Sequence, residues 1–259
     1  MFLVGDIGNT DTKICLVNPR KKIIRKINFS SKNITNTQLK EKFKKLKLQN
    51  LNLKKCLFCS VVPKTFKIIK KYIKNNYNIK YFELKDIKID KLIKIKVNKK
   101  QIGSDRLANA IGSMNNKDNF IILDFGTATT FDVLVKNVYH GGIISPGIKL
   151  SLDTLVENAS LIPNLKLRKI DKVIGSNTVN AVRSGFFWGY RGLIDNIVNL
   201  IKKETKKSFK IIVTGGFSHL FNKFNNKKVS INRDITIKGL IKASSLIKQI
   251  WKKNYYFAH

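Results

Sequence analysis

The sequence predicts an α/β protein built from two similar domains. Residues 2–17 (FLVGDIGNTDTKICLV) place an Asp-Ile-Gly turn between two apolar runs, a pattern typical of strand, turn and strand. Residues 120–135 (FIILDFGTATTFDVLV) repeat this pattern, and Asp6 corresponds to Asp124 at an offset of 118 residues. Because apolar runs alternate with stretches of helical spacing in both halves, we expect two α/β domains around a cleft.

The boundary between the domains is predicted near residues 115–119 (NNKDN). The first domain then spans residues 1–117 and the second spans residues 118–259. No low-complexity linker separates the halves, so we expect the two domains to pack tightly.

Further elements of the first half follow from apolar spacing and from breakers. We expect strands at 23–29, 56–62 and 79–84, helices at 38–53 and 64–75, and exposed loop or edge strand over 85–100. The apolar run 56–62 stops at Pro63, which indicates a short buried strand. A helix is predicted after Gly103, with Ser104 as its N-cap.

The second half continues the same alternation after its hairpin. We expect helices at about 148–159, 177–203 and 238–252, and a strand at 210–214. That strand ends in a third glycine turn, Thr214-Gly215-Gly216, which suits backbone approach to a nucleotide or an ordinary loop.

The chain is strongly basic, with 51 Lys+Arg against 16 Asp+Glu and a net charge of +35. Lys outnumbers Arg by 44 to 7, and Lys, Ile and Asn together make 106 of 259 residues, which indicates A/T-rich coding rather than selection for a polyanion. The excess of basic residues is also spread along the chain. Residues 1–118 hold 29 basic and 8 acidic groups, and the remaining residues hold 22 basic and 8 acidic groups. Nucleic-acid readers concentrate their charge and favour Arg, so no specific nucleic-acid partner is expected.

No window of 18 apolar residues is present, and Asp6 stands where a signal peptide needs its apolar stretch. We therefore expect a cytoplasmic protein without a membrane partner. The cysteines, Cys15, Cys56 and Cys59, do not describe a disulfide framework. Cys56 and Cys59 are three positions apart on a predicted strand, so they point to opposite faces and cannot clamp one metal.

The first hairpin turn carries groups that suit a polyphosphate. Its glycine lets backbone N–H groups face outward without a Cβ in the way. Asn9, Thr10 and Thr12 add neutral donors, and Lys13 adds a positive charge. Asp6 at the strand end suits a hydrated Mg²⁺. The alternative is an ordinary hairpin, because Asn and Gly are common turn residues.

The second turn, residues 124–130 (DFGTATT), is again of the phosphate-binding type. Two such turns related by duplication are expected to face each other across the cleft, and the pair is more specific than either turn alone.

Residues 103–106 (GSDR) open the predicted helix and supply a candidate acid or base. The helix dipole favours Asp105 in the first turn, which is the ordinary explanation for it. Arg106 opposes the dipole at that end, which indicates a bound carboxylate or phosphate. Only 12 Asp and 4 Glu occur in the chain, so an acid in this position stands out.

The predicted helix 177–203 holds a stripe of small residues, namely Ala181, Gly185, Gly189 and Gly192. Small residues at this spacing let another backbone approach closely. The stripe therefore indicates either close packing inside the chain or a subunit interface.

In their order along the chain, these motifs resemble those of type III pantothenate kinases. The matching motifs are D-x-G-N-T-x-x-K, S-V-V-P, G-x-D-R, D-F-G-T-A-T-T-F-D, G-G-x-I-x-P-G, G-x-N-T and T-G-G, from Asp6 to about Leu240. The resemblance implies two duplicated ribonuclease-H-like domains of the actin-like and sugar-kinase superfamily. It also implies ATP-dependent phosphorylation of pantothenate to 4′-phosphopantothenate, the first step of coenzyme A biosynthesis, by a homodimer.

The resemblance also implies a role for individual residues. The phosphates of ATP and Mg²⁺ would be held by Asp6, Ile7, Gly8, Asn9, Thr10, Asp11, Thr12 and Lys13, and ATP also by Thr127. Asp124 would hold a monovalent cation, K⁺ or NH₄⁺. Pantothenate would be bound by Gly103, Ser104, Asp105, Arg106 and Thr178, with Asp105 as the catalytic proton acceptor.

Two stretches depart from the pattern of the family. The family usually has a Tyr and a Pro shortly before the G-x-D-R motif, whereas residues 95–100 read IKVNKK. Residues 136–140 also lack the usual Asp-Gly turn. The first departure concerns one substrate contact and the mouth of the pocket.

Two other functions remain open at this point. One is a catalytically weak homologue that acts as a basic nucleic-acid-binding accessory protein, and the other is a kinase of the same fold for another small hydroxy acid. Retention of Asp6, Asp105, Arg106 and Asp124 favours the enzyme, because a binding module does not need all of them.

Overall fold

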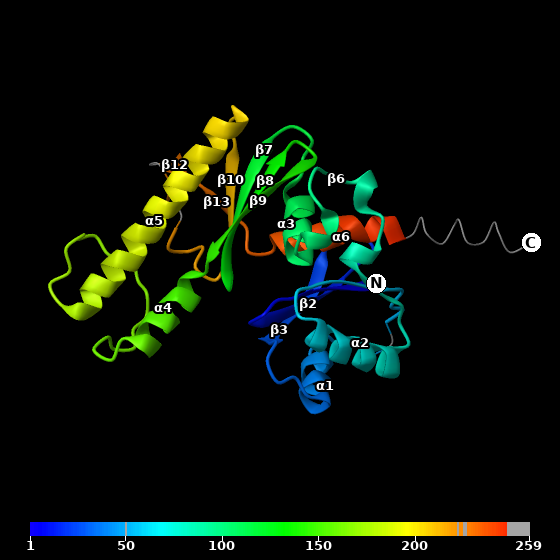
Figure 1. The fold of residues 1–259 in the computed structure, drawn as a ribbon. Helices are drawn as coiled ribbons and strands as arrows, with labels where there is room; N and C mark the ends of the chain where they lie inside the picture. The colour runs from blue at the N-terminus through cyan, green and yellow to red at the C-terminus, as the bar shows by residue number, and fades with distance from the viewer. Residues whose placement is uncertain (50, 222, 225–226, 248–259) are drawn as a thin grey trace, which may run out of the picture. The chain divides into compact units, whose positions relative to one another are not determined.

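The computed structural model describes residues 1–49, 51–221, 223–224 and 227–247 (Figure 1). The chain divides into two compact units. Residues 1–114 and the described residues from Asp234 onward form the first unit, and residues 115–233 form the second. This division differs from the predicted boundary at 117/118 mainly because the last helix returns to the first unit.

The first unit contains a five-stranded sheet. Its strands are β1 (Phe2–Ile7), β2 (Asp11–Val17), β3 (Ile23–Ser30), β4 (Cys56–Ser60) and β5 (Tyr81–Glu83), in the order β3-β2-β1-β4-β5. The first three strands are antiparallel, whereas β4 runs parallel to β1 and β5 parallel to β4. The register places Asp6 beside Lys13 on one side and Cys59 on the other. Paired residues share a face of the sheet, so these three side chains point the same way.

Helices cover both faces of this sheet. The helices α1 (Asn36–Lys44) and α2 (Pro63–Tyr77) cover the face that carries Leu3, Ile7 and Phe58 (Figure 1). The opposite face, where Asp6 lies, is covered by α3 (Ser104–Ser113) and α6 (Ile235–Ala243), which also pack on each other. Their contact is close: a Cβ on Gly112 would lie 2.3 Å from the carbonyl oxygen of Ile235. This contact explains why α6 belongs to the first unit.

The remaining elements of the first unit are short. They are the 3₁₀ turns η1 (Leu84–Asp86), η2 (Ile89–Lys91), η3 (Lys99–Gln101) and η4 (Ser244–Leu246), and the strand β6 (Lys94–Ile95).

The second unit repeats the strand order of the first. Its strands are β7 (Asn119–Phe125), β8 (Ala128–Val135), β9 (Val138–Pro146), β10 (Lys210–Gly215) and β13 (Ser230–Ile231), in the order β9-β8-β7-β10-β13. Again the first three are antiparallel and the last two run parallel to their neighbours. A separate antiparallel pair is formed by β11 (Lys223–Phe224) and β12 (Lys227–Lys228). The shared order and directions confirm the duplication predicted from the two Asp-x-Gly turns.

Two helices complete the second unit, α4 (Ile148–Asn158) and α5 (Thr178–Thr205). The long helix α5 packs with Phe187, Ile194 and Val198 against Leu123 and Phe125 of the sheet. It starts where the Asn177 side chain accepts a hydrogen bond of 2.9 Å from the backbone N–H of Asn180. No helix in the described part of the chain is long and apolar enough to cross a membrane.

Three predicted elements differ from the structure in detail. The helix predicted over 38–53 ends at Lys44, although Leu46 and Leu48 beyond it are still buried. The predicted N-cap Ser104 is wrong: the N-cap is Gly103, and Ser104 is the first helical residue. The last helix begins earlier than predicted, at Ile235, and residues 248–252 of that prediction lie outside the described residues.

Candidate active site

Two half-buried carboxylates meet in the first unit, one at the end of β1 and one at the start of α3. They belong to Asp6 and Asp105, which lie close enough for the charge of Asp105 to act on Asp6. The alternation of β1 turns Asp6 away from the core formed with α1 and α2, toward the face that α3 covers. The fold thus brings together two acids that are 99 residues apart in the sequence.

The surroundings of Asp6 favour its protonated form. Its Oδ1 accepts a hydrogen bond of 3.4 Å from the thiol of Cys59. Burial, followed by the negative charge of Asp105, raises the pKa of Asp6 to about 6, while the Cys59 hydrogen bond and Lys13 act in the opposite direction. A cation bound here would relieve this unfavourable placement of two like charges.

Asp105 is held against its own helix start. Its Oδ1 accepts a hydrogen bond of 2.8 Å from the backbone N–H of Arg106. A Cβ on Gly103 would lie 2.4 Å from the same oxygen, so the carboxylate occupies the space that a larger residue would fill. Burial raises the pKa of Asp105, although the backbone N–H and the charge of Arg106 oppose this. A carboxylate with a raised pKa is a better proton acceptor than an ordinary surface aspartate.

The first hairpin turn is compact and presents its tip to solvent. The backbone N–H of Gly8 donates a hydrogen bond of 3.0 Å to the carbonyl oxygen of Asp11, and Asn9 and Thr10 between them are exposed. The structure contradicts the prediction that the side chain of Thr12 adds a donor to the loop. Its side chain is fully buried, and its hydroxyl lies 2.8 Å from that of Ser31.

The physical reason is the parity of the strand. Thr12 pairs with Ile7, and both side chains face the core formed with α1 and α2. Any contact that Ile7 and Thr12 make with a nucleotide therefore involves their backbone and not their side chains.

Lys13 forms an ion pair that no local sequence pattern predicts. Its Nζ lies 3.1 Å from Oδ1 of Asp234, the residue before α6, and Lys26 reaches the same oxygen at 3.3 Å. Partial burial opposes ionisation of Asp234, but the hydrogen bonds and charges of the two lysines outweigh it and lower the pKa of Asp234. Asp234 therefore holds the ammonium group of Lys13 on the same face of the sheet as Asp6.

The second hairpin turn has the same plan with different side chains. The backbone N–H of Gly126 donates a hydrogen bond of 3.1 Å to the carbonyl oxygen of Ala128, with the exposed Thr127 between them. Asp124 pairs with Thr130 across the hairpin. The hydroxyl of Thr130 is buried and has no hydrogen-bond partner among the described residues.

The third glycine turn lies beside the second hairpin, because β10 pairs with β7 and Thr214 is in register with Asp124. Gly215 has a φ of +85°, and a Cβ there would lie 2.5 Å from the backbone of Phe125. The backbone N–H of Gly216 donates to the carbonyl oxygen of Phe125 at 3.0 Å. Packing inside the second unit thus already requires glycine at position 215.

The remaining predicted residues fall into two groups. Gly103, Ser104 and Arg106 lie with Asp105 at the start of α3 in the first unit. Thr178 is the exposed first residue of α5 in the second unit. The side chain of Ser104 is only 1% exposed, and its hydroxyl donates a hydrogen bond to Glu83.

The residues present fit the cations that the resemblance implies. Among the described residues, no group of three or more His, Cys, Asp or Glu is arranged to hold a metal. A lone carboxylate such as Asp6 suits Mg²⁺, which keeps several waters and takes further oxygens from substrate phosphates. The carboxylate of Asp124 and the neighbouring hydroxyl of Thr130 are oxygen donors of the kind that a monovalent cation takes.

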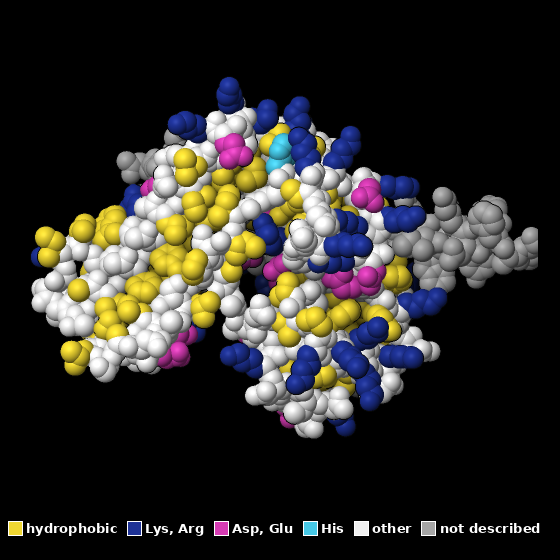
Figure 2. Space-filling model, viewed as in Figure 1, with side chains coloured by type: hydrophobic (Ala, Val, Ile, Leu, Met, Phe, Trp, Pro, Cys, Tyr) yellow, Lys and Arg dark blue, Asp and Glu magenta, His cyan; other side chains and the backbone are white. Residues whose placement is uncertain are grey.

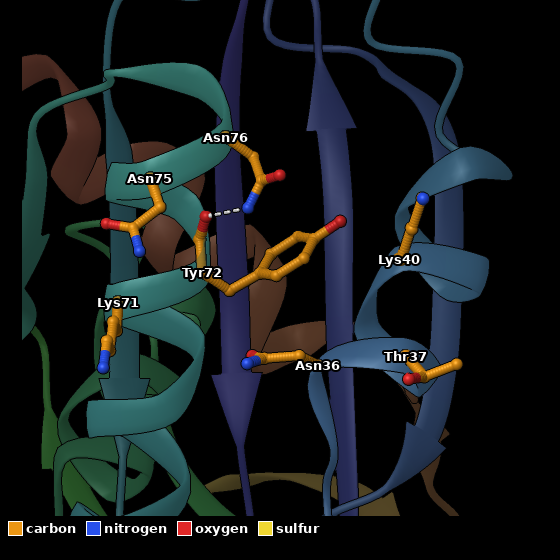
Figure 3. A pocket seen from close by; sticks show the side chains of 7 residues that line it. All are labelled: Asn36, Thr37, Lys40, Lys71, Tyr72, Asn75 and Asn76. Carbon is orange, nitrogen blue, oxygen red and sulfur yellow. Dashed lines mark hydrogen bonds between the residues drawn. The ribbon is translucent and has the colours of Figure 1, made fainter.

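A polar pocket of about 400 Å³ lies elsewhere in the first unit, between α1 and α2 (Figure 3). It is lined by Asn36, Thr37, Lys40, Lys71, Tyr72, Asn75 and Asn76. These helices cover the face of the sheet opposite to Asp6, so the pocket is no part of the carboxylate pair. The side chain of Asn76 donates a hydrogen bond of 2.9 Å to the backbone carbonyl of Tyr72 within α2.

Comparison with known proteins bears directly on this arrangement. Residues 2–200 match the family model of type III pantothenate kinase. The chain belongs to the type III pantothenate kinase family. A type III pantothenate kinase from Pelagibacter ubique (strain HTCC1062) is 64% identical over 248 residues, which cover 96% of this chain and 100% of that protein.

Solved structures with low sequence identity share the fold. A Campylobacter jejuni protein described as a Baf family transcriptional activator has a TM-score of 0.60 at 18% identity, covering 96% of this chain and 99% of its own. A Sinorhizobium meliloti protein described as a 2-dehydro-3-deoxygalactonokinase has a TM-score of 0.58 at 10% identity. The match covers 97% of this chain and 99% of that protein. These low-identity similarities show that the chain shares its fold with these two proteins, in agreement with the predicted fold class.

Sequence reasoning missed three polar residues around the carboxylate pair, namely Cys59, Glu83 and Asp234. Glu83 carried a usable signal, because it is one of only 4 Glu and lies one residue before the end of the predicted strand 79–84. Cys59 could have been paired with Asp6 once β4 was placed beside β1. Asp234 had no local signal, since it meets Lys13 only through the packing of α6.

Proposed function

We propose that this member of the type III pantothenate kinase family phosphorylates pantothenate at the carboxylate pair of Asp6 and Asp105. The reaction converts ATP and pantothenate into ADP and 4′-phosphopantothenate, the first step of coenzyme A biosynthesis. The observation that carries the proposal is the meeting of these two acids, at the end of β1 and the start of α3, in a chain whose family performs this reaction. A base and a cation-holding acid placed side by side are what phosphoryl transfer to an alcohol needs.

Asp105 is proposed as the proton acceptor. The primary hydroxyl oxygen of pantothenate forms a bond to the γ-phosphorus of ATP, the bond from that phosphorus to the β,γ-bridging oxygen breaks, and the hydroxyl proton passes to an Oδ of Asp105. Phosphoryl transfer has a loose transition state, so the proton is accepted late and the main task is orientation. The hydrogen bond from the backbone of Arg106 fixes the carboxylate for this task.

The first hairpin is proposed to bind the phosphates of ATP. The turn presents the exposed side chains of Asn9 and Thr10, and Lys13 contributes positive charge. Asp6 would hold Mg²⁺, and the ion would supply positive charge to offset the negative charge of the transferring phosphoryl group. Asp234 keeps Lys13 on the Asp6 face before the nucleotide arrives.

The second hairpin is proposed to contribute Thr127 as a contact to ATP and Asp124 as the ligand of a monovalent cation, K⁺ or NH₄⁺. Asp124 lies opposite a buried hydroxyl without a hydrogen-bond partner among the described residues, that of Thr130. Pantothenate is proposed to contact Gly103, Arg106 and Thr178, and the charge of Arg106 suits its carboxylate.

The exposed surface of α4 and α5 supports a homodimer. Figure 2 shows hydrophobic side chains gathered over these helices, where Leu150 is 50% and Leu200 54% exposed. A Cβ on Gly185, Gly189 or Gly192 would meet no described atom within 4 Å. Ala181, the first residue of the stripe, packs closely against Gly175. The three glycines do not serve close packing among the described residues, which favours the subunit interface as their use.

Among the described residues, no feature favours the nucleic-acid-binding alternative. On the face shown in Figure 2, Lys and Arg are few over α4 and α5 and numerous elsewhere, without forming one continuous stripe. A diffuse positive surface attracts nucleic acid without sequence preference. Cytoplasmic location stays a prediction.

The proposal is tested by ADP release with and without pantothenate, using wild type, Asp105→Asn and the control Asp90→Asn, which changes an exposed acid. We expect release to depend on pantothenate and turnover of Asp105→Asn to fall by roughly 10²–10⁴, the usual effect of a general base. Thermal unfolding and nucleotide binding of this variant should stay close to wild type. Pantothenate-independent release, or full turnover by Asp105→Asn, would contradict the proposal.

A further inference from the structure

We propose that Glu83 is a positioning residue for the base Asp105 and acts through the buried hydroxyl of Ser104. The inference rests on the proposed role of Asp105. It assigns a function to a residue that has no place in the sequence motifs, and it gives Ser104 a task other than contacting the substrate.

The first step of the argument is the hydrogen bonding of Glu83. One carboxylate oxygen accepts a hydrogen bond from the hydroxyl of Ser104, and the other accepts one from the backbone N–H of Lys85. The backbone of Ser60 also hydrogen-bonds this carboxylate. Glu83 thereby connects the end of β4, the turn η1 and the first residue of α3.

The second step is that the N-cap residue of α3 provides no side-chain cap to the helix start. Its N-cap, Gly103, offers no side chain to accept from the free N–H groups of the first turn. Ser104 is 1% exposed, so its hydroxyl has little access to a substrate in solution. The bond between Glu83 and Ser104 therefore fixes the first turn of α3 against the edge of the sheet.

The third step links this anchor to the base. Asp105 directly follows Ser104. Its carboxylate lies so close to Gly103 that a Cβ at position 103 would be 2.4 Å from Oδ1. If the Ser104 anchor is lost, the first turn can move and the carboxylate moves with it. Misplacement of a catalytic group by about 1 Å costs up to roughly 10²-fold in rate.

The test measures kcat and KM of the full-length chain for Glu83→Gln, Ser104→Ala and the double variant. The controls are Ser113→Ala, which removes another buried hydroxyl from α3, and Glu41→Gln on the exposed face of α1. Asp105→Asn serves as the reference for loss of the base, and thermal unfolding reports the folded fraction of each variant.

We expect Glu83→Gln and Ser104→Ala each to lower kcat by roughly 10–100-fold, with the KM for ATP within about twofold of wild type. The double variant should be no worse than the poorer single variant, because both changes break one connection. The two controls should keep wild-type kcat.

Three results would overturn the inference. Unchanged kcat in both single variants, even with a lower unfolding temperature, would reduce the contact to a stabilising one. A raised KM for pantothenate in Ser104→Ala alone would return Ser104 to the substrate site. Additive losses in the double variant would show two independent roles. Should Glu83→Gln not fold, kcat of Ser104→Ala against Ser113→Ala decides by itself. Full turnover by Asp105→Asn would instead overturn the proposed function.

Discussion

The two units of this chain share one strand order but place different chemistry at the same hairpin. In the first unit Asp6 faces Lys13 across the hairpin, whereas in the second unit Asp124 faces Thr130. The second turn is also one residue shorter, with Thr127 alone between the hydrogen-bonded residues where the first turn has Asn9 and Thr10. Both hairpins have an acid at the end of the first strand and a glycine in the turn. They differ in the residue that pairs with the acid.

This difference indicates a division of labour. A lysine beside the acid suits the multiple negative charges of phosphates, because it offsets both the acid and the ligand. A hydroxyl beside the acid supplies an oxygen donor without adding positive charge, which suits a singly charged cation. The helices differ too: α3 brings Asp105 to the first hairpin, whereas α5 carries an exposed stripe of glycines.

Among the predictions that follow from this comparison, the largest effect is expected for the glycine stripe on α5 of the second unit. Gly185→Leu places a side chain where no described atom of the same chain lies within 4 Å. We expect the dissociation constant of the dimer to rise by roughly 100-fold, near the upper end of the cost of overpacking. The unfolding temperature of the monomer should not fall, because leucine favours helix more than glycine does.

Light scattering and analytical ultracentrifugation measure this change, with Gly185→Ala as the smaller control. A wild type that is monomeric at micromolar concentration would remove the proposed interface and, with it, this contrast between the units.

The second prediction sharpens the contrast between Asp6 and an ordinary acid. Its pKa is raised from 3.8 to about 6 in the folded chain. The folded state therefore binds the proton more tightly than the unfolded state, and the resulting stability is fully present below pH 3.8 and lost as the pH rises through about 6. The substitution Asp6→Asn removes the titrating carboxylate, so the variant does not lose this stability as the pH rises.

We expect the free energy of unfolding of Asp6→Asn, relative to wild type, to increase by about 2 kcal/mol between about pH 4 and pH 7. Urea denaturation without nucleotide or Mg²⁺ measures it, and Asp11→Asn, an exposed acid of the same turn, is the control. Parallel pH profiles for Asp6→Asn and wild type would show that Asp6 ionises as an ordinary surface acid.

The smallest expected effect concerns Asp124. If Asp124 holds a monovalent cation, activity should rise saturably with K⁺ or NH₄⁺ at constant ionic strength and remain low in Na⁺ or Tris. Asp124→Asn should flatten this response and lower activity at saturating K⁺ by about tenfold, since one charged ligand is lost. Equal wild-type activity in Na⁺ and K⁺ would make Asp124 a structural residue and not a cation ligand.

Much of the fold could be predicted because its signals are local. The hairpin of β1 and β2, the buried strand that ends before Pro63 and the long helix α5 all follow from apolar spacing and breakers. The predicted N-cap Ser104 failed for a non-local reason: its hydroxyl has a partner in Glu83, 21 residues earlier, which competes with capping. The predicted loop donor Thr12 failed because strand parity, fixed by pairing with Ile7, turned it toward the core.

By itself the sequence determined the duplication, the two glycine turns and the family, because each depends on residue types at fixed spacing. Only the tertiary structure decided which acids share a site and which side chains support them. The contacts of Asp6 with Cys59, of Lys13 with Asp234 and of Ser104 with Glu83 join segments far apart in the chain. Such contacts arise when strands pair and helices pack to bury apolar surface, and no local pattern records which polar groups that packing brings together.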